Sequence, residues 1–289
     1  MIIDTALITA CGFGTRWLPE TKSIQKEMLP VLNRPVIDYN LQDCIKAGIS
    51  HFVIAVSPDH NQVQQYLQPP KSLEKHLKDH GKLEVNRHYL REFDGIKFTF
   101  ICVDESLPYG TYNTLLSARK YLEKLDAFVV FVGDDFVYNP NGSSEAAKLI
   151  KLMNSEIDVV LDAITKPTEE LNRYGVLAVD DNGHLKTFVE KPKLGEEPSN
   201  LINISKYVFS SSIYDAIDRA YVKTSNYEYV LVEAIQLLAD KGRVKVVESQ
   251  GEYLDGGTIP NWLLANLTMA WDDPELRKLI SGFVDKQNS

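Results

Sequence analysis

Five short apolar segments, rich in β-branched and aromatic residues, occur along the first half of the chain. Their length and composition predict buried strands. They are TALITA (5–10), HFVIAVS (51–57), KFTFICV (97–103), AFVVFVG (127–133) and DVVLDAI (158–164).

Segments with helical spacing of apolar residues separate several of these predicted strands. One covers 36–49 and places Gly48 where helices commonly end, and another covers 112–125. Alternation of strand and helix predicts an α/β fold with a doubly wound, mostly parallel central sheet of the Rossmann-like type. Such sheets bind ligands beyond the carboxyl ends of their strands. The functional site is therefore expected just after these segments.

The remaining segments have different patterns. Residues 58–96 are polar but poor in Gly and Ser, which predicts a helical insertion rather than a linker. Residues 173–210 predict a β-hairpin around DDNG followed by another strand. A helix is expected near 228–240, a strand at 244–249, and a helical segment over 260–289. A chain of 289 residues suits one large α/β domain or a domain with a small appendage, and we predict a single domain, 1–289.

Composition narrows the class of protein. The chain has 44% hydrophobic and 25% charged residues, as in soluble globular proteins, and its apolar runs are shorter than the roughly 20 residues of a membrane helix. Its first residues, MIIDTALITA, lack the basic start of a secretion signal. Three widely spaced cysteines, Cys11, Cys44 and Cys102, suit free thiols in a reducing compartment. We therefore expect a cytoplasmic protein without a membrane partner.

A formal net charge of −9 argues against binding to nucleic acid, because a phosphate backbone requires a basic face. Any bound phosphate must instead meet a local cluster of cations. The stretch CGFGTRWLPETKSIQKEMLP (11–30), directly after the first predicted strand, has two glycines followed by Arg16 and Lys26. Glycine lets a backbone approach a ligand closely, and exposed amides can bind phosphate.

Two interpretations of this stretch are open from its spacing alone. It is either a tight turn with a solvated arginine or a phosphate-binding loop. The Rossmann pattern GxGxxG is absent, since Trp17 stands in place of its third glycine, and the Walker pattern is absent too.

Residues 6–49 resemble the signature of the sugar-1-phosphate nucleotidylyltransferases, of the form GxGTRxxPxTxxxxKxMLPxxxxPxI. The resemblance continues through FVGDDF, RYGVLAVD, VEKPK and LDGGT, and so covers nearly the whole chain. TKSIQKEMLP, the 58–96 insertion and EKPKLGEEPSNL are most similar to the bacterial UTP–glucose-1-phosphate uridylyltransferase branch. The residues in register are Gly12, Gly14, Thr15, Arg16, Pro19, Thr21, Lys26, Met28, Leu29, Pro30 and Pro35.

This resemblance implies transfer of a nucleotidyl group from UTP to glucose 1-phosphate, which forms UDP-glucose and pyrophosphate. A phosphate oxygen of the sugar phosphate would attack the α-phosphorus in line, without a covalent enzyme intermediate. The resemblance also implies a set of site residues. They are Arg16, Lys26 and Lys191 as catalytic cations; Ala10, Cys11, Gly12, Gly14, Thr15, Glu105 and Gly110 at the nucleotide; and Gly175, Glu190, Lys191 and Asn200 at the sugar.

A magnesium site is expected at the carboxyl edge of the sheet. Asp134 follows a predicted strand, and Asp255 follows the strand-like EYL. Mg²⁺ is commonly held by one or two carboxylates together with substrate phosphates. By resemblance these two aspartates are the Mg²⁺ ligands. For Asp135 we favour a structural role as a cap over metal ligation.

The chain departs from the family pattern where the base is read. Glu105 stands at the position of a glutamine that reads uracil, and Tyr112 and Asn113 replace a glycine and a histidine. An ionised carboxylate can accept from uracil N3–H but has no proton for O4, and it would suit guanine better. Either Glu105 contacts the base, or a loop shift leaves it in solvent. Ser205 stands where the family often has glycine.

The expected partners are a nucleoside triphosphate and a sugar 1-phosphate. Oligomers are common in the family, so we expect a homo-oligomer, although the apolar positions of the 260–271 helix are also explained by core packing. Glu228 is a further candidate for ordering the pocket. Three alternatives are weighed: another nucleotide or sugar specificity, a noncatalytic regulatory paralogue, and a dinucleotide-binding oxidoreductase, which the missing GxGxxG opposes.

Overall fold

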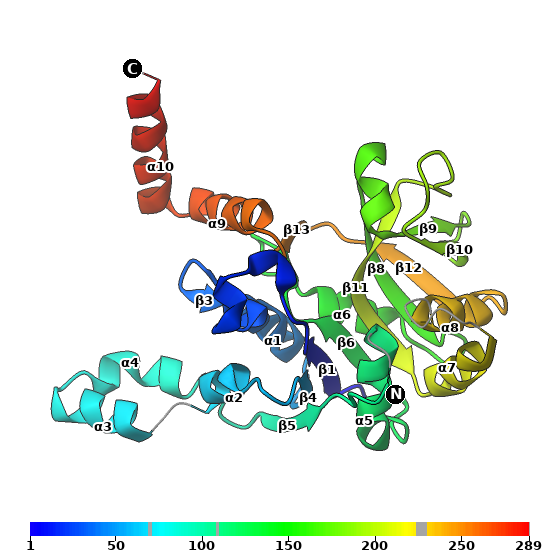
Figure 1. The fold of residues 1–289 in the computed structure, drawn as a ribbon. Helices are drawn as coiled ribbons and strands as arrows, with labels where there is room; N and C mark the ends of the chain where they lie inside the picture. Colours follow the sequence, from blue (N-terminus) through cyan, green and yellow to red (C-terminus); the bar gives the residue numbers. More distant parts are fainter. Residues whose placement is uncertain (69–70, 108–109, 224–229, 289) are drawn as a thin grey trace.

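The computed structural model describes residues 1–68, 71–107, 110–223 and 230–288 (Figure 1). Within these residues the central sheet has nine strands, in the order β10-β9-β11-β6-β1-β4-β5, with β8 pairing β11 and β12 pairing β8. The strands are β1 (Thr5–Ala10), β4 (His51–Val56), β5 (Lys97–Cys102), β6 (Ala127–Val132), β8 (Val159–Thr165), β9 (Gly175–Val179), β10 (Leu185–Glu190), β11 (Leu201–Ser210) and β12 (Val244–Glu248).

The amino-terminal half of the sheet is parallel and doubly wound. β6, β1, β4 and β5 pair in parallel, and successive residues of β1 face opposite sides: Leu7 packs in one hydrophobic cluster, Ala6 and Ile8 in another. The strands at 5–10, 51–57, 97–103, 127–133 and 158–164 are confirmed to within one residue. The helices here are α1 (Val36–Lys46), α5 (Thr111–Leu122) and α6 (Glu145–Leu152).

Gly48 has the role predicted for it. Ala47 caps α1, and Gly48 follows with a φ of +93°, in the left-handed region that glycine adopts without strain.

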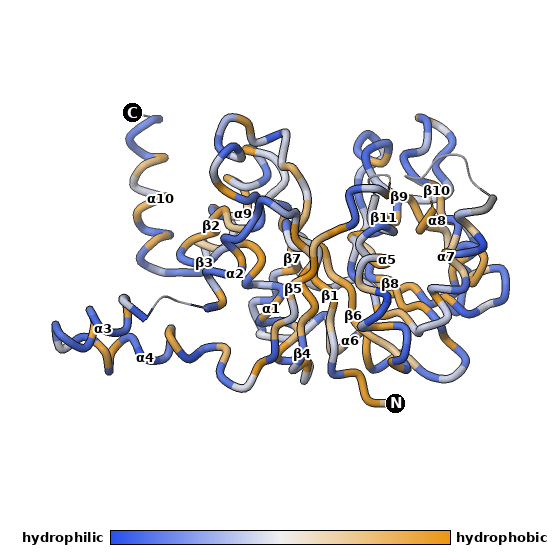
Figure 2. Tube along the Cα trace, turned by 60° about the horizontal axis from the view of Figure 1, so that its bottom comes forward, coloured by the Kyte–Doolittle hydropathy of each residue, from blue (hydrophilic) through white to orange (hydrophobic). Residues whose placement is uncertain are grey.

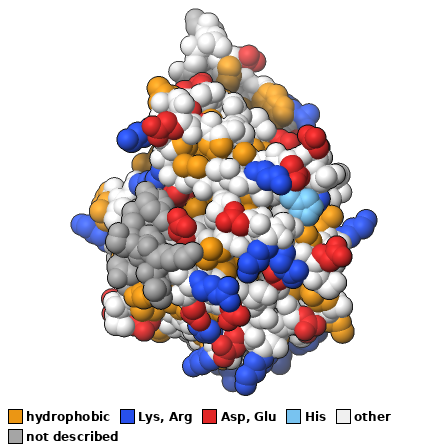
Figure 3. Space-filling view, turned by 90° about the vertical axis from the view of Figure 1, so that its right-hand side faces the viewer, with side chains coloured by type: hydrophobic (Ala, Val, Ile, Leu, Met, Phe, Trp, Pro, Cys, Tyr) orange, Lys and Arg blue, Asp and Glu red, His pale blue; other side chains and the backbone are white. Residues whose placement is uncertain are grey.

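The other half of the sheet is built around β11, which runs antiparallel to β6, β8 and β9. The hairpin predicted around 180–183 is confirmed as β9 and β10, and α7 (Ser212–Lys223) and α8 (Val230–Ala239) pack together on this half. Acidic and basic side chains are interspersed on this side of the molecule (Figure 3). The sheet is therefore parallel around β1, the strand that leads into the loop at 11–30, and it is mixed around β11.

Three short helices occupy the polar segment 58–96: α2 (Gln62–Leu67), α3 (Lys71–Asp79) and α4 (Leu83–Leu90). α3 and α4 extend away from the sheet and are mostly hydrophilic, whereas the apolar segments gather in the central strands (Figures 1 and 2). In the described residues α3 and α4 have no buried side chain.

A small second sheet joins distant parts of the sequence. β7 (Asp135–Tyr138) pairs antiparallel with β13 (Glu252–Asp255), and Asp255 lies opposite Asp135. A further pair, β2 (Pro30–Val31) and β3 (Arg34–Pro35), follows the loop at 11–30. α9 (Ile259–Asp272) is capped by the Thr258 hydroxyl, and α10 (Pro274–Gln287) projects from the body (Figure 1).

Among the described helices, none is both long enough and apolar enough to cross a bilayer.

Candidate active site

A cavity of about 720 Å³ opens beyond the carboxyl ends of β1, β4, β5 and β6, where the strand pattern places the site. Its other wall comes from β10, β11 and α8, so it lies between the two halves of the sheet. The lining residues are Thr9, Cys11, Gly12, Phe13, Lys26, Glu27, Ser57, Val103, Asp104, Glu105, Leu107, Gly110, Thr111, Asn113, Thr114, Val132, Asp134, Phe188, Glu190, Asn203, Ser205, Tyr207, Leu231 and Val232.

The loop after β1 is held in a tight conformation by its own side chains. Gly14 has a φ of +62°, and a Cβ atom there would lie 2.7 Å from the Thr21 methyl group. The Thr21 hydroxyl donates a hydrogen bond of 2.9 Å to the Gly14 carbonyl. The Trp17 indole N–H donates to the Gly256 carbonyl at 2.8 Å, which ties the loop to the segment after β13. The glycine and the threonine of the motif thus fit each other sterically.

The predicted nucleotide-binding residues of this loop fall into two groups. Cys11 and Gly12 line the cavity. Ala10, at the end of β1, and Gly14, Thr15 and Arg16 are not among its described lining residues, and the Arg16 side chain is exposed on the short 3₁₀ helix Thr15–Trp17. Arg16 therefore lies beside the cavity, not in its wall.

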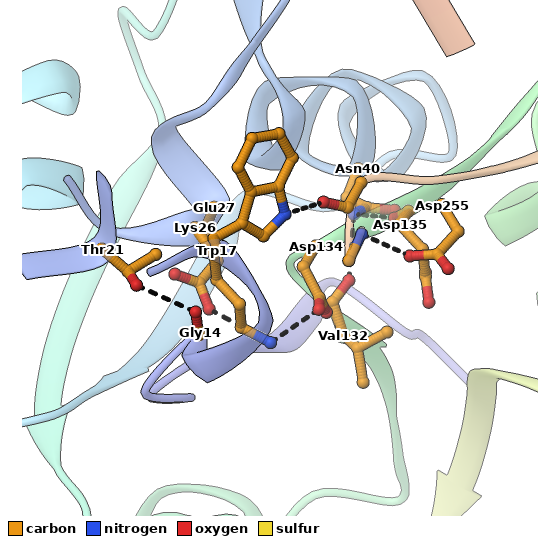
Figure 4. Close-up of polar contacts among 12 residues, drawn as sticks. Gly14, Trp17, Thr21, Lys26, Glu27, Asn40, Val132, Asp134, Asp135 and Asp255 are labelled. Atoms are coloured by element: carbon orange, nitrogen blue, oxygen red, sulfur yellow. Dashed lines mark hydrogen bonds and ion pairs between the residues drawn. The ribbon is translucent and has the colours of Figure 1, made fainter. Parts of the chain in front are cut away.

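Lys26 pairs with Asp134 inside the cavity (Figure 4). Its ammonium lies 2.6 Å from Asp134 Oδ2, although the two residues are 108 positions apart in the chain. Burial by itself would raise the pKa of Asp134, but the neighbouring Lys26 ammonium outweighs it and holds that pKa below its usual value. The pair therefore keeps a carboxylate ionised in a largely enclosed place.

Glu27, which was not predicted as a site residue, lies next to this pair. Its Oε1 is 3.9 Å from the Lys26 ammonium, and its side chain is 1% exposed. Burial raises the pKa of Glu27 to about 7, and the Lys26 charge opposes that rise. The lysine of the KEMLP motif thus faces two carboxylates.

Asp134 and Asp255, the predicted metal pair, are neighbours through the backbone. Gly256 N–H donates to the Asp134 carbonyl at 3.0 Å, and Asp255 pairs with Asp135 across β7 and β13. The Asp255 carboxylate accepts from Gly257 N–H at 2.6 Å and from the Asn261 amide at 2.9 Å, and it does not line the cavity.

The donor atoms of this site suit a magnesium ion that is bound partly by the protein and partly by a substrate. Among the described residues, no three His, Cys, Asp or Glu side chains are grouped so that they could hold a metal by themselves. Asp134 provides a hard oxygen ligand in the cavity wall, and Asp255 provides a second carboxylate on an adjacent backbone segment. Mg²⁺ is commonly bound by one or two carboxylates with water and substrate phosphates. The residues therefore suit an ion that arrives with a phosphorylated substrate.

Asp135 has a structural role, as favoured, but as an ion-pair partner and not as a cap. Its buried carboxylate pairs with the Lys206 ammonium and accepts from the Tyr253 hydroxyl at 2.9 Å. The Lys206 ammonium also donates to the Asp135 carbonyl at 3.1 Å. Sequence reasoning did not identify Lys206; the available signal was a lone lysine inside the apolar strand LINISKYVFS.

On the sugar side, Glu190 lines the cavity at the end of β10, directly opposite Gly175 in β9. A Cβ atom at Gly175 would lie 2.4 Å from a Phe188 ring carbon and 2.8 Å from Glu190 Oε2. Glycine is thus required for the glutamate to lie where it does.

Two other predicted sugar residues lie outside the cavity lining. Lys191 has a φ of +47° and a largely exposed side chain, with its ammonium 3.9 Å from Glu190 Oε1. The exposed Asn200 donates to the Lys166 carbonyl at 3.2 Å and to the Thr168 hydroxyl at 3.4 Å, so it braces the segment before the 3₁₀ helix Thr168–Arg173. The further candidate Glu228 lies outside the described residues.

The turn after β5 contains the residues predicted to contact the nucleotide base. Glu105 is exposed and lines the cavity, as does Gly110, which precedes α5. Asn113, at the family's histidine position, donates to the carbonyls of Asp104 at 2.9 Å and Leu107 at 3.4 Å and so holds the turn closed.

β11 adds lining residues that sequence reasoning did not assign to a role. The Asn203 amide donates to the Tyr207 hydroxyl at 2.7 Å, within a bulge where β11 shifts register. Ser205 has a φ of +56°, a conformation that glycine adopts more easily.

Comparison with known proteins agrees with this geometry. Residues 5–272 match the nucleotidyl transferase family. The chain is 31% identical to the UTP–glucose-1-phosphate uridylyltransferase of Bacillus subtilis (strain 168), over 98% of this chain and 96% of that protein. It is 30% identical to the enzyme of that name from Pseudomonas aeruginosa PAO1, over 91% and 95%.

Among solved structures, the UTP-bound UGPase from Acinetobacter baumannii superposes with a TM-score of 0.83 at 25% identity, over 98% of this chain and 99% of that one. The α/β fold with its mostly parallel sheet is the fold of these enzymes. The chain therefore belongs to the nucleotidyl transferase family and is an enzyme of that kind, related over nearly its full length to the UTP–glucose-1-phosphate uridylyltransferases.

Proposed function

We propose that this protein transfers a uridylyl group from UTP to glucose 1-phosphate and releases pyrophosphate. The observation that carries the proposal is the Lys26–Asp134 pair, which lies in one cavity with the loop at 11–13 on one side and Glu190 on the other. The names of the relatives support the same reaction.

In the reaction, a phosphate oxygen of the sugar phosphate forms a bond to the α-phosphorus of UTP, and the bond to the bridging oxygen of pyrophosphate breaks. Two anionic substrates must meet, so catalysis depends on position and on positive charge near the phosphates. We assign Lys26 to the α-phosphate, because its ammonium is in the cavity wall. Arg16 and Lys191, at the margins, are assigned to the triphosphate and to the sugar phosphate respectively.

The metal assignment follows from the donor set. Asp134 and Asp255 would hold Mg²⁺ together with phosphate oxygens of the substrates. When bound, that ion would draw negative charge away from the reacting phosphates. The chain itself supplies Glu190 to hydrogen-bond sugar hydroxyls, and Gly175 leaves the room that Glu190 occupies.

A second nucleotide specificity is favoured by one observation, the Glu105 carboxylate in the cavity wall. A carboxylate accepts two hydrogen bonds and donates none, which suits guanine better than uracil. Pyrophosphate release should therefore be measured for UTP, dTTP, CTP and GTP, each with glucose 1-phosphate and with related sugar phosphates. Highest kcat/KM for UTP and glucose 1-phosphate is expected. A preference for GTP would indicate that Glu105 binds a guanine base. If no pair of substrates releases pyrophosphate, a noncatalytic paralogue would be favoured.

Other assignments remain predictions. The single domain 1–289 and the cytoplasmic location, which rests on three free thiols, are among them. So is a homo-oligomer, supported by apolar side chains exposed on α9 and α10.

A further inference from the structure

One ammonium in the cavity faces two carboxylates. The Lys26 nitrogen lies 2.6 Å from Asp134 Oδ2 and 3.9 Å from Glu27 Oε1, and all three side chains line the cavity (Figure 4). A movement of about 1 Å would bring the ammonium within hydrogen-bond distance of Glu27. The short contact is with Asp134, and Glu27 is a second carboxylate within reach.

The Glu27 carboxylate is buried, and one of its oxygens lacks a partner among the described residues. Its side chain is 1% exposed, and within the described residues its Oε2 has no hydrogen-bond partner. A buried carboxylate oxygen without a donor is destabilising, so such an atom in a native structure calls for a reason. A Cβ atom at Gly133 would lie 3.1 Å from Glu27 Cγ and 2.6 Å from the Thr9 carbonyl, so the backbone packs closely against this side chain.

The pairing of Lys26 with Asp134 conflicts with the metal role assigned to Asp134. A divalent cation and an ammonium group repel each other strongly a few ångströms apart in a partly enclosed site. Once the Asp134 carboxylate ligates a cation, this repulsion therefore favours displacement of the Lys26 ammonium. A second acceptor close by lowers the free energy of that displacement.

We propose that Glu27 is a positioning residue that accepts the Lys26 ammonium when Asp134 engages a divalent cation. The exchange gives the buried Glu27 carboxylate a donor at Oε1, the oxygen that faces Lys26. This inference rests on the proposed function, because it takes Asp134 as a metal ligand.

The test is a thermodynamic cycle on metal binding without substrate. Mn²⁺ is titrated into the full-length protein at a pH well above the pKa of Glu27, and free Mn²⁺ is read by electron paramagnetic resonance. Lys26→Met should tighten binding, and Glu27→Gln should weaken it about tenfold, a coupling within the range for contacting charged pairs. In the Lys26→Met background, Glu27→Gln should change affinity less than about twofold.

Equal weakening in both backgrounds would overturn the proposal, because Glu27 would then act on the metal directly through its charge. An unchanged affinity for Glu27→Gln in the presence of Lys26 would overturn it too. Asp104→Asn is the matched control: it removes another carboxylate from the same cavity wall and should leave Mn²⁺ affinity nearly unchanged. If Glu27→Gln does not fold, as judged by circular dichroism, Glu27→Asp should bind Mn²⁺ with affinity close to the unmodified protein.

Asp134→Asn distinguishes a failure of the proposed metal site from a failure of the proposed role of Glu27. Loss of Mn²⁺ binding in that variant is expected. Retained binding would refute the metal assignment of the proposed function, and the exchange with it. Loss of binding together with additive effects of Lys26→Met and Glu27→Gln would refute only the role of Glu27.

Discussion

At the scale of single residues, burial determines how strongly a charged side chain acts on its neighbours. Lys26 lies in the cavity wall and holds Asp134 ionised, whereas Lys22, four residues earlier in the same loop, is exposed. Without the family motif, the sequence does not distinguish these two lysines. Only Lys26 lies in the cavity, where the proposed reaction requires positive charge near the phosphates.

We expect Lys26→Ala to lower kcat about a hundredfold or more, the loss typical of removing one electrostatic stabiliser. Pyrophosphate release under saturating substrates measures it. Lys22→Ala is the matched control and should retain kcat within about twofold. Equal effects of the two substitutions would exclude a specific role for Lys26.

Asp162, in the middle of β8, is a buried acid far from any predicted function. Its side chain is inaccessible, its Oδ2 lacks a hydrogen-bond partner among the described residues, and burial raises its pKa to about 8. Because the folded pKa lies above the unfolded one, the folded state binds the proton more tightly. Its contribution to stability is thus complete at low pH and is lost as the pH rises through about 8.

Between pH 7 and pH 9 this group should lower the free energy of unfolding by about 1 kcal/mol. Urea denaturation at the two pH values measures the change. Asp162→Asn should reduce the dependence on pH by that amount, while Asp181→Asn, at an exposed turn position, should not. A pH dependence that persists unchanged in Asp162→Asn would show that another group causes it.

At the scale of elements, the hairpin of β9 and β10 positions the proposed sugar ligand. Gly175 and Glu190 are paired in register, and the missing Cβ leaves the volume that Phe188 and Glu190 fill. The pairing within the hairpin thus explains why the chain has glycine at 175 beside glutamate at 190. In the sequence, only the family resemblance linked these two residues.

Gly175→Ala should lower stability by about 1 to 3 kcal/mol, as overpacking does, and raise KM for glucose 1-phosphate about tenfold by displacing Glu190. Thermal denaturation and initial rates measure the two effects. Gly282→Ala in α10, where a Cβ meets nothing within 4 Å, should instead stabilise the helix by about 0.5 to 1 kcal/mol. A normal KM in Gly175→Ala would argue against Glu190 as a sugar ligand.

At the scale of the whole molecule, the carboxyl-terminal helices present apolar side chains to solvent. Leu263, Leu267 and Trp271 on α9, and Leu279 and Phe283 on α10, are each at least 42% exposed. α10 contacts α9 and otherwise projects from the body (Figure 1). An exposed apolar face of this kind is typical of an interface between subunits.

We expect sedimentation to give a mass above the 32.7 kDa of one chain, and Phe283→Lys to lower it. The reason is that a buried lysine at an apolar interface is strongly unfavourable. Lys278→Glu, which also changes an exposed side chain of α10, should leave the mass unchanged if that residue faces away from the contact. A monomer for the unmodified protein would reject the predicted homo-oligomer.

Much of the fold was predictable because its signals are local. Buried strands and amphipathic helices have characteristic periods, and Gly48 and the turn at 180–183 mark ends of elements. The antiparallel insertion of β11 between β6 and β8 was not predicted, because pairing between strands depends on contacts far apart in sequence. The same limit applies to Lys206, whose partner Asp135 is 71 positions away.

By itself, the sequence determined the periods of the elements, the loop motif, the family resemblance and the residue types available for phosphate and metal chemistry. These depend on short-range sterics and on residue identity. The tertiary structure alone decided that Lys26 faces Asp134 and Glu27, that Arg16 and Lys191 stay at the margins, and that Asn113 closes the base-side turn. Such pairings depend on burial and on distances between strands, because electrostatic strength varies steeply with both.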